Sequence, residues 1–133
     1  MELDEAAALS ILQAAQAARP DEACGLLLGI PNSHRITRMT LATNVAATPA
    51  TRFEIDPAHL LTTQRTARQA GLAILGCWHS HPDGCLQPSR HDQAGALWPG
   101  LLWLIAAGGE LGLWLPSEQG FDAVQLVRSA PGL

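Results

Sequence analysis

The sequence predicts a layered α/β domain in which helices flank a mixed β-sheet, and three patterns carry this prediction. Apolar residues recur at helical spacing near the amino terminus, an Asp-Pro pair opens a second helical segment, and short apolar runs separated by glycine or proline turns fill much of the remainder. At 133 residues the chain has the size of one ordinary domain, so we expect residues 1–133 to form a single domain.

A helix and a buried strand are expected at the start of the chain. Apolar positions between residues 3 and 18 fall on one face of a helix, and Pro20 ends the pattern. The apolar run over residues 23–30 is long enough for a buried strand and too short for a helix. We therefore expect a helix over residues 3–18 and a strand directly after it.

Two further strands and a second helix are expected next. Residues 35–45 and 51–55 are rich in β-forming residues and partly alternate between apolar and polar. Asp56 is a suitable N-cap, a proline follows at the first helical position, and a glycine lies at the carboxyl end of the segment. These signals predict a helix over residues 57–70.

The second half of the chain is expected to supply most of the sheet. Residues 72–78 are unbroken apolar, as in a central strand covered on both faces. Residues 89–98 favour a short helix. Three strands separated by glycine or proline turns are predicted at residues 101–106, 111–115 and 121–127.

Charge and composition exclude several classes of function. The net charge is −4 and the eight arginines are scattered, so the chain has no basic surface run for nucleic acid or anionic lipid. It has no lysine, which excludes Schiff-base chemistry on a lysine side chain.

The amino terminus and the cysteines point to a cytosolic protein. The first residues are acidic and lack a secretory signal pattern, and no span approaches the roughly 20 apolar residues of a membrane helix. The three cysteines are odd in number and match no disulfide framework, which fits a reducing compartment.

Residues 77–92 concentrate the side chains that could bind a metal. They include three of the five histidines, two of the three cysteines and two aspartates. His79 and His81 are two residues apart, so on an extended strand their imidazoles leave the same face, as a shared metal ion requires. A catalytic zinc site usually has three protein ligands and a fourth position for water, so a third ligand is expected.

Three residues are candidates for the third ligand. Asp83 lies in a Pro-Asp-Gly turn, where an aspartate normally bonds to its own backbone, so we expect a structural role. His91 and Asp92 are neighbours on the predicted helix, about 100° apart around its axis, so at most one should face the metal. Spacing alone leaves both open. Ser89 and Asp92 can also be read as a helix-start pair with no catalytic part.

Taken together, His79-Ser80-His81, seven residues, Ser89, two residues and Asp92 resemble the H-S/T-H-x7-S-x2-D signature of the JAMM (MPN+) metalloprotease family. Residues 20–29, which include Glu22, resemble the segment where that family carries a glutamate. Residues 53–57 resemble the strand-to-helix junction of the small stand-alone bacterial members.

The resemblance implies a cytidine-deaminase-like α/β/α sandwich in which His79, His81 and Asp92 hold one zinc ion per chain. It selects Asp92 over His91 as the third ligand. It also implies that Glu22 is the general acid/base and that Ser89 helps to hold the tetrahedral intermediate.

These implied roles agree with the chemistry of amide hydrolysis. Zinc lowers the pKa of its water to about 7, which supplies hydroxide at neutral pH. A carboxylate can take a proton from that water and return it to the departing amine. A hydroxyl can donate to the developing oxyanion.

The remaining histidines and cysteines are expected to be structural. His34 and His59 lack partners in the sequence and are expected on the surface or on a helix face. Cys24 and Cys77 lie in apolar runs and should be small buried hydrophobes. Cys85 should be exposed in the loop after His81, either as an inert thiol or as an extra ligand.

The resemblance also implies a class of substrate. JAMM enzymes cleave peptide or isopeptide bonds after ubiquitin-like C-termini, and the small bacterial forms resemble processors of sulfur-carrier proteins that end in Gly-Gly. A glycine tail could add as a strand to a sheet edge that includes residues 41–53. Two alternatives are an inactive MPN-type interaction module and a zinc hydrolase that acts on a small-molecule amide.

Overall fold

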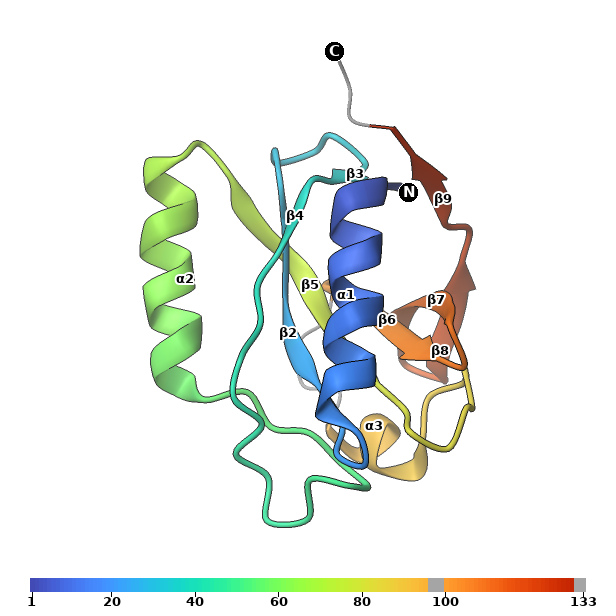
Figure 1. Ribbon diagram of the computed structural model, residues 1–133. Coiled ribbons are helices and arrows are strands. Elements are labelled where there is room, and N and C mark those ends of the chain that lie inside the picture. The colour runs from blue at the N-terminus through green and yellow to red at the C-terminus, as the bar shows by residue number, and fades with distance from the viewer. Residues whose placement is uncertain (96–99, 131–133) are drawn as a thin grey trace.

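A six-stranded mixed sheet organises the computed structural model of this protein, which describes residues 1–95 and 100–130 (Figure 1). The strand order is β4-β2-β5-β6-β7-β8. Only β5 and β6 are parallel neighbours, and the other adjacent pairs are antiparallel. The predicted mixed sheet is therefore confirmed. The strands are β2 (Cys24–Gly29), β4 (Arg38–Met39), β5 (Ala73–Ser80), β6 (Leu102–Ala107), β7 (Glu110–Ser117) and β8 (Gly120–Val124).

Helices α1 (Glu5–Ala18) and α2 (Pro57–Gln69) pack against opposite faces of this sheet (Figure 1). Successive strand residues point to opposite faces, so Leu27 and Trp78 belong to the core under α1, while Leu26 and Cys77 belong to the cluster that Leu60 of α2 joins. This layering confirms the predicted α/β class. The specific likeness to the cytidine-deaminase fold stays a prediction.

A second, three-stranded sheet was not predicted. Its order is β3 (Arg35–Ile36), β1 (Glu2–Asp4) and β9 (Val127–Ser129), with both pairings parallel. The predicted helix start at residue 3 is therefore wrong, because residues 2–4 form a strand and the helix begins at Glu5. Local periodicity could not show this, since both strands that pair with β1 are distant in sequence.

The predicted strands at residues 35–45 and 51–55 are only partly correct. The first segment forms β3, β4 and isolated bridges at Ala42 and Asn44, and the second contributes one bridge at Ile55. The reason is a loop between them whose backbone groups bond to the side chain of Asn44 instead of to a neighbouring strand.

The carboxyl-terminal part differs from prediction in one respect. The predicted strand at residues 121–127 is divided into β8 and β9, which lie in different sheets. Helix α3 (Arg90–Gly95) confirms the described part of the predicted helix at residues 89–98, of which 96–98 lie outside the described residues. Within the described part of the chain, no helix is long and apolar enough to span a membrane.

The pairing of β2 with β5 depends on a close approach at Gly25. Gly25 lies opposite Trp78, whose fully buried indole donates a hydrogen bond of 2.9 Å to the backbone oxygen of Thr40. A Cβ atom on residue 25 would lie 1.7 Å from that oxygen and 2.5 Å from the indole nitrogen. Only glycine therefore allows β2, β5 and Thr40 to meet as they do.

We expect Gly25→Ala to lower the free energy of unfolding by about 1–3 kcal/mol or more, because the added methyl group overpacks a backbone contact that cannot move freely. Urea denaturation would measure the effect. Gly112→Ala is the matched control, since its Cβ would meet its nearest atom at an ordinary 3.4 Å. Equal stability of both variants would show that the Gly25 contact is not limiting.

Candidate active site

Two buried imidazoles lie together at the carboxyl end of β5. His79 is 0% exposed and His81 is 6% exposed, and their Nε2 atoms are 3.0 Å apart. The backbone N–H of His81 donates to Ala106 of β6, which keeps the chain extended past the last residue of β5. The extended backbone therefore places both rings on one face, as the spacing predicted.

Asp92 completes a triangle with the two histidines. Its Oδ2 lies 3.0 Å from the Nε2 atom of each ring, and the residue is 2% exposed. His91, its neighbour on α3, is exposed, so only one of the two faces the histidines. The Oδ1 atom of Asp83 accepts a bond of 2.9 Å from Cys85 N–H, which confirms the predicted structural turn.

Ser89 and Asp92 form a reciprocal pair at the start of α3. The Ser89 N–H donates to Asp92 Oδ2 at 2.8 Å, and the Asp92 N–H donates to Ser89 Oγ at 3.1 Å. The pair therefore forms the helix start that was considered for it, and these bonds do not test whether it also takes part in catalysis. The same carboxylate oxygen also reaches both imidazoles, so the cap holds Asp92 at the centre of the cluster.

Glu22 reaches the cluster through the register of β2 and β5. Cys24 pairs with His79, so continuing the antiparallel pairing by two residues places Glu22 across from His81. Ser80 secures this extension, because its Oγ accepts from Ala23 N–H at 2.8 Å and its own N–H donates to the Ala23 carbonyl at 3.0 Å. One potential ligand atom from each of Glu22, His79 and His81 lies within 4.8 Å of the others.

The donor set fits a divalent metal ion. The carbonyl of Cys85 lies 2.6 Å from His81 Nδ1, so a neutral His81 carries its proton there and leaves a lone pair on Nε2. Asp92 Oδ2 also offers lone pairs, and His79 Nε2 can supply one proton at most. The three atoms are 3.0 Å apart, close to the ~3.3 Å between ligands of a tetrahedral zinc site. A cation between the three atoms would accept their lone pairs and remove the repulsion among them.

His79 is oriented by packing on its outer side. Its ring stacks on Phe53 with centroids 4.2 Å apart and an interplanar angle of 19°. Its Nδ1 atom is buried and has no hydrogen-bond partner among the described residues. The aromatic contact therefore takes the place of the hydrogen bond that usually orients a metal-binding histidine.

The environment drives the pKa values of the two carboxyl groups apart. Burial raises the pKa of Glu22 to about 7, with the nearby Asp92 charge adding to the effect and His81 opposing it. Burial also acts to raise the pKa of Asp92, but the interactions of its carboxylate with His79 and His81 outweigh it and hold that pKa far below its ordinary range. Such separation suits a proton carrier beside a permanently charged ligand.

The two imidazoles also differ. Burial lowers the pKa of His79, which favours its neutral form. For His81 burial acts in the same direction, but the bonds to Asp92 and to the Cys85 carbonyl outweigh it and raise the pKa. Protons therefore compete with a metal ion for His81 more strongly than for His79.

Cys85 contacts the site through its backbone. Its carbonyl bonds to His81, while its exposed thiol lies 3.9 Å from the carbonyl of Gln87. Cys24 and Cys77 are buried as predicted, and burial raises the pKa of Cys24 to about 12. The expectation for the other two histidines is confirmed, with His34 exposed and His59 on α2.

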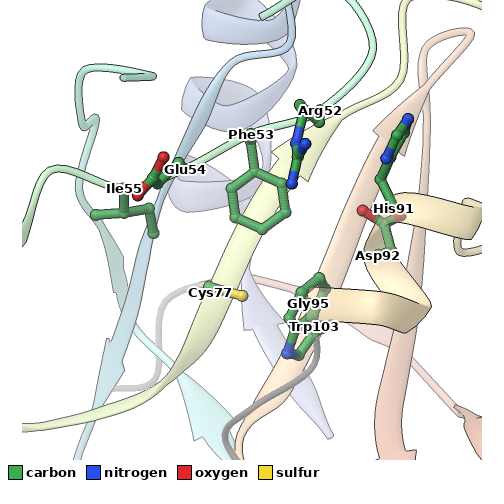
Figure 2. A pocket seen from close by; sticks show the side chains of 9 residues that line it. All are labelled: Arg52, Phe53, Glu54, Ile55, Cys77, His91, Asp92, Gly95 and Trp103. Atoms are coloured by element: carbon green, nitrogen blue, oxygen red, sulfur yellow. The ribbon is translucent and has the colours of Figure 1, made fainter. Parts of the chain in front are cut away.

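A pocket of about 430 Å³ opens beside Asp92 (Figure 2). Figure 2 shows it between the segment that carries Phe53 and helix α3. Its lining combines apolar and polar side chains and includes Arg52, Phe53, Cys77, His91 and Trp103.

Sequence analysis assigned no role to Ser80, Phe53 or Asn44. The position of Ser80 between the two histidines was the available signal for the first. The other two lie in a loop whose path depends on side chain to backbone bonds, which leave no periodic pattern in the sequence.

We expect Glu22→Gln to stabilise the metal-free protein at pH 8 by about 1–3 kcal/mol, because an ionised carboxylate is no longer buried. The pKa of Glu22 is raised from its ordinary value of 4.5 to about 7 in the folded protein. The wild type therefore loses stability as the pH rises between these two values. The difference between variant and wild type should grow over this window and then stay constant. Urea denaturation at pH 5 and pH 8 measures it, and a difference independent of pH would contradict the assignment. Exposed Glu118→Gln is the control.

Similarity to known proteins extends over most of the chain. A family model for prokaryotic homologs of the JAB domain matches residues 4–120. The desampylase of Haloferax volcanii is 35% identical over 88 residues, which are 66% of this chain and 63% of that protein. A probable TtuB-protein conjugate cleaving protease of Thermus thermophilus is 31% identical over 100 residues, 75% of this chain and 66% of that protein. The matches thus span slightly less than two thirds of each relative.

A solved structure agrees over nearly the whole chain. The solution structure of a protein from Desulfitobacterium hafniense has a TM-score of 0.87 at 29% identity and covers 98% of this chain and 93% of that one. The fold and the family model agree with the resemblance predicted from residues 79–92. The chain therefore belongs to the family of prokaryotic homologues of the JAB domain.

Proposed function

We propose that this protein is a zinc-dependent JAMM-type metallopeptidase that hydrolyses the bond after the C-terminal Gly-Gly of a ubiquitin-like protein. One observation carries the proposal: His79, His81 and Asp92 converge at 3.0 Å with Glu22 beside them. The names of the two relatives, a desampylase and a conjugate cleaving protease, support the same class of reaction.

His79, His81 and Asp92 are the proposed ligands of one zinc ion. When bound, zinc supplies Lewis acidity that makes a water molecule a nucleophile at neutral pH. The three residues are nearly inaccessible to solvent, so their charges and lone pairs act in a medium of low polarity.

Glu22 is the proposed general acid/base. Its carboxyl group is buried, and its pKa of about 7 allows it to take up and release a proton near neutral pH. It would accept a proton from the attacking water and deliver it to the amine that leaves.

Ser89 is the proposed oxyanion donor. Its Oγ accepts a bond from the Asp92 N–H, which fixes the oxygen next to the ligand cluster. The hydroxyl proton can then point toward the carbonyl oxygen of the scissile bond as negative charge develops there.

The proposed substrate is a ubiquitin-like protein of the sulfur-carrier type, and the proposed compartment is the cytosol. Thr40 and Ala42 bond inward to β2, so the backbone groups of Leu41 and Thr43 face away from that strand. Leu41 is 61% exposed. This edge could accept a flat glycine tail by strand addition and lead it to the pocket beside Asp92.

We expect the wild type to remove a short peptide that follows Gly-Gly on a ubiquitin-fold carrier, as measured by mass spectrometry. Glu22→Gln should lower the rate by about 10²–10⁴-fold, because the variant cannot exchange a proton with water. A chelator should stop the reaction and zinc should restore it. The Glu118→Gln control should keep wild-type rates.

The other outcomes have defined meanings. Undiminished cleavage by Glu22→Gln would overturn the assigned mechanism. Hydrolysis of small amides without any cleavage of the carrier would favour a small-molecule hydrolase. Zinc binding with no hydrolysis of either substrate would favour an interaction module.

Metal binding can be tested separately from catalysis. We expect Asp92→Asn to weaken zinc binding at least about 10-fold, because an anionic ligand is lost, and His91→Ala to leave it unchanged. For the wild type, affinity should fall between pH 7.5 and pH 5.5, since His81 must release its proton to bind the metal. Competition with a chromogenic chelator measures both effects. Weaker binding by His91→Ala than by Asp92→Asn would reverse the choice of ligand.

A further inference from the structure

We infer that Asn44 is a positioning residue for Glu22, holding the main chain from which the buried carboxylate reaches the two histidines. This inference rests on the proposed function, because it concerns the same acid/base residue. Asn44 lies 22 residues after Glu22 and outside the metallopeptidase signature.

The side chain of Asn44 makes four hydrogen bonds and one longer contact, all to backbone atoms. Its Nδ2 donates to the carbonyl oxygens of Glu22 at 3.0 Å and Arg52 at 3.1 Å, and a longer contact of 3.5 Å reaches Pro49. Its Oδ1 accepts from the N–H groups of Ala46 at 3.1 Å and Glu54 at 3.0 Å. The amide thereby closes the loop formed by residues 44–54.

The same loop holds the other polar group of the Glu22 backbone. The Glu22 N–H donates to the Pro49 carbonyl at 2.8 Å, while its own carbonyl accepts from Asn44. Glu22 lies two residues before the first residue of β2, so no neighbouring strand of the ladder supplies these bonds. Asn44 and its loop take the place of that strand.

The carboxylate of Glu22 depends on this arrangement. The residue is 4% exposed, and its Oε1 atom has no hydrogen-bond partner among the described residues. Since that oxygen receives no bond to orient it, its position follows from the main chain. A shift of the Glu22 backbone would move the proton carrier relative to His81 without moving the ligands, which β5 and α3 hold.

The experiment compares Asn44→Asp and Asn44→Ala with the wild type. Asp is nearly isosteric and keeps the Oδ1 acceptor but loses the Nδ2 donors, so it removes the bonds to the Glu22 and Arg52 carbonyls and leaves those to Ala46 and Glu54. Arg35→Ala is the control, because it removes bonds to Glu2 and to the Ala130 carbonyl in the small sheet, far from α3 in Figure 1. Four quantities are measured for each variant: stability, zinc affinity, kcat and KM. The substrate for kcat and KM is a carrier with a fluorogenic amide after Gly-Gly. Hydrogen exchange of the Glu22 amide is followed in the metal-free proteins.

We expect both Asn44 variants to lower kcat about 10- to 100-fold, because a displaced catalytic group loses its alignment. KM should change less, zinc affinity should be retained, and the Glu22 amide should exchange faster. Arg35→Ala should lose stability but keep kcat and the slow exchange of Glu22.

Several results would overturn the inference. The first is wild-type kcat in both Asn44 variants, and the second is an equal loss of kcat in Arg35→Ala. The third is a loss of zinc affinity that accounts for the loss of kcat. If the wild type cleaves no carrier, the proposed function fails, whereas unchanged exchange of the Glu22 amide in Asn44→Ala refutes the positioning role by itself.

Discussion

The antiparallel pairing of β2 with β5, in the register that sets Cys24 opposite His79, is the constraint on which the site depends. It brings Glu22, more than fifty residues earlier in the chain, to His81. A slip of one residue would turn every side chain of β2 to the opposite face and remove Glu22 from the cluster. A glycine is also needed on the other side of β5, where it pairs with β6, since a Cβ on Gly76 would lie 2.1 Å from the Leu102 carbonyl.

Burial has opposite consequences for the two carboxylates of the site. Asp92 receives hydrogen bonds from its neighbours, so its charge is stabilised despite the loss of solvent. Glu22 has a buried oxygen without a partner among the described residues, so its charged form is penalised. The fold therefore separates a permanent anion from a proton carrier by hydrogen bonding, although both residues are almost fully buried.

The sequence predicted the helices and strands that are defined by local patterns. The Asp56-Pro57 start, the apolar run into His79 and the turns between β6, β7 and β8 were all readable. The small sheet was not, because β1 is fixed only by strands at distant positions of the chain. Short strands of two or three residues carry too little periodicity to be recognised.

The site residues were likewise predictable only where a local pattern defines them. His79 and His81 could be paired from strand geometry, but the residues alone left His91 and Asp92 open, and the family signature made the choice. The structure agrees because helix α3 turns Asp92 inward. Contacts made by backbone atoms, such as that of the Cys85 carbonyl with His81, could not be predicted from the sequence, since any amino acid can supply a carbonyl.

The Ser89 and Asp92 pair has a consequence for reading related sequences. Because Asp92 bonds to the Ser89 N–H at the start of α3 as well as facing the histidines, position 92 has a folding reason to stay aspartate that is independent of chemistry. A relative without hydrolytic activity could keep this residue because it stabilises the start of the helix. The imidazole of His79 makes no hydrogen bond to the backbone among the described residues, so its loss would be the earlier sign of a relative without catalytic activity.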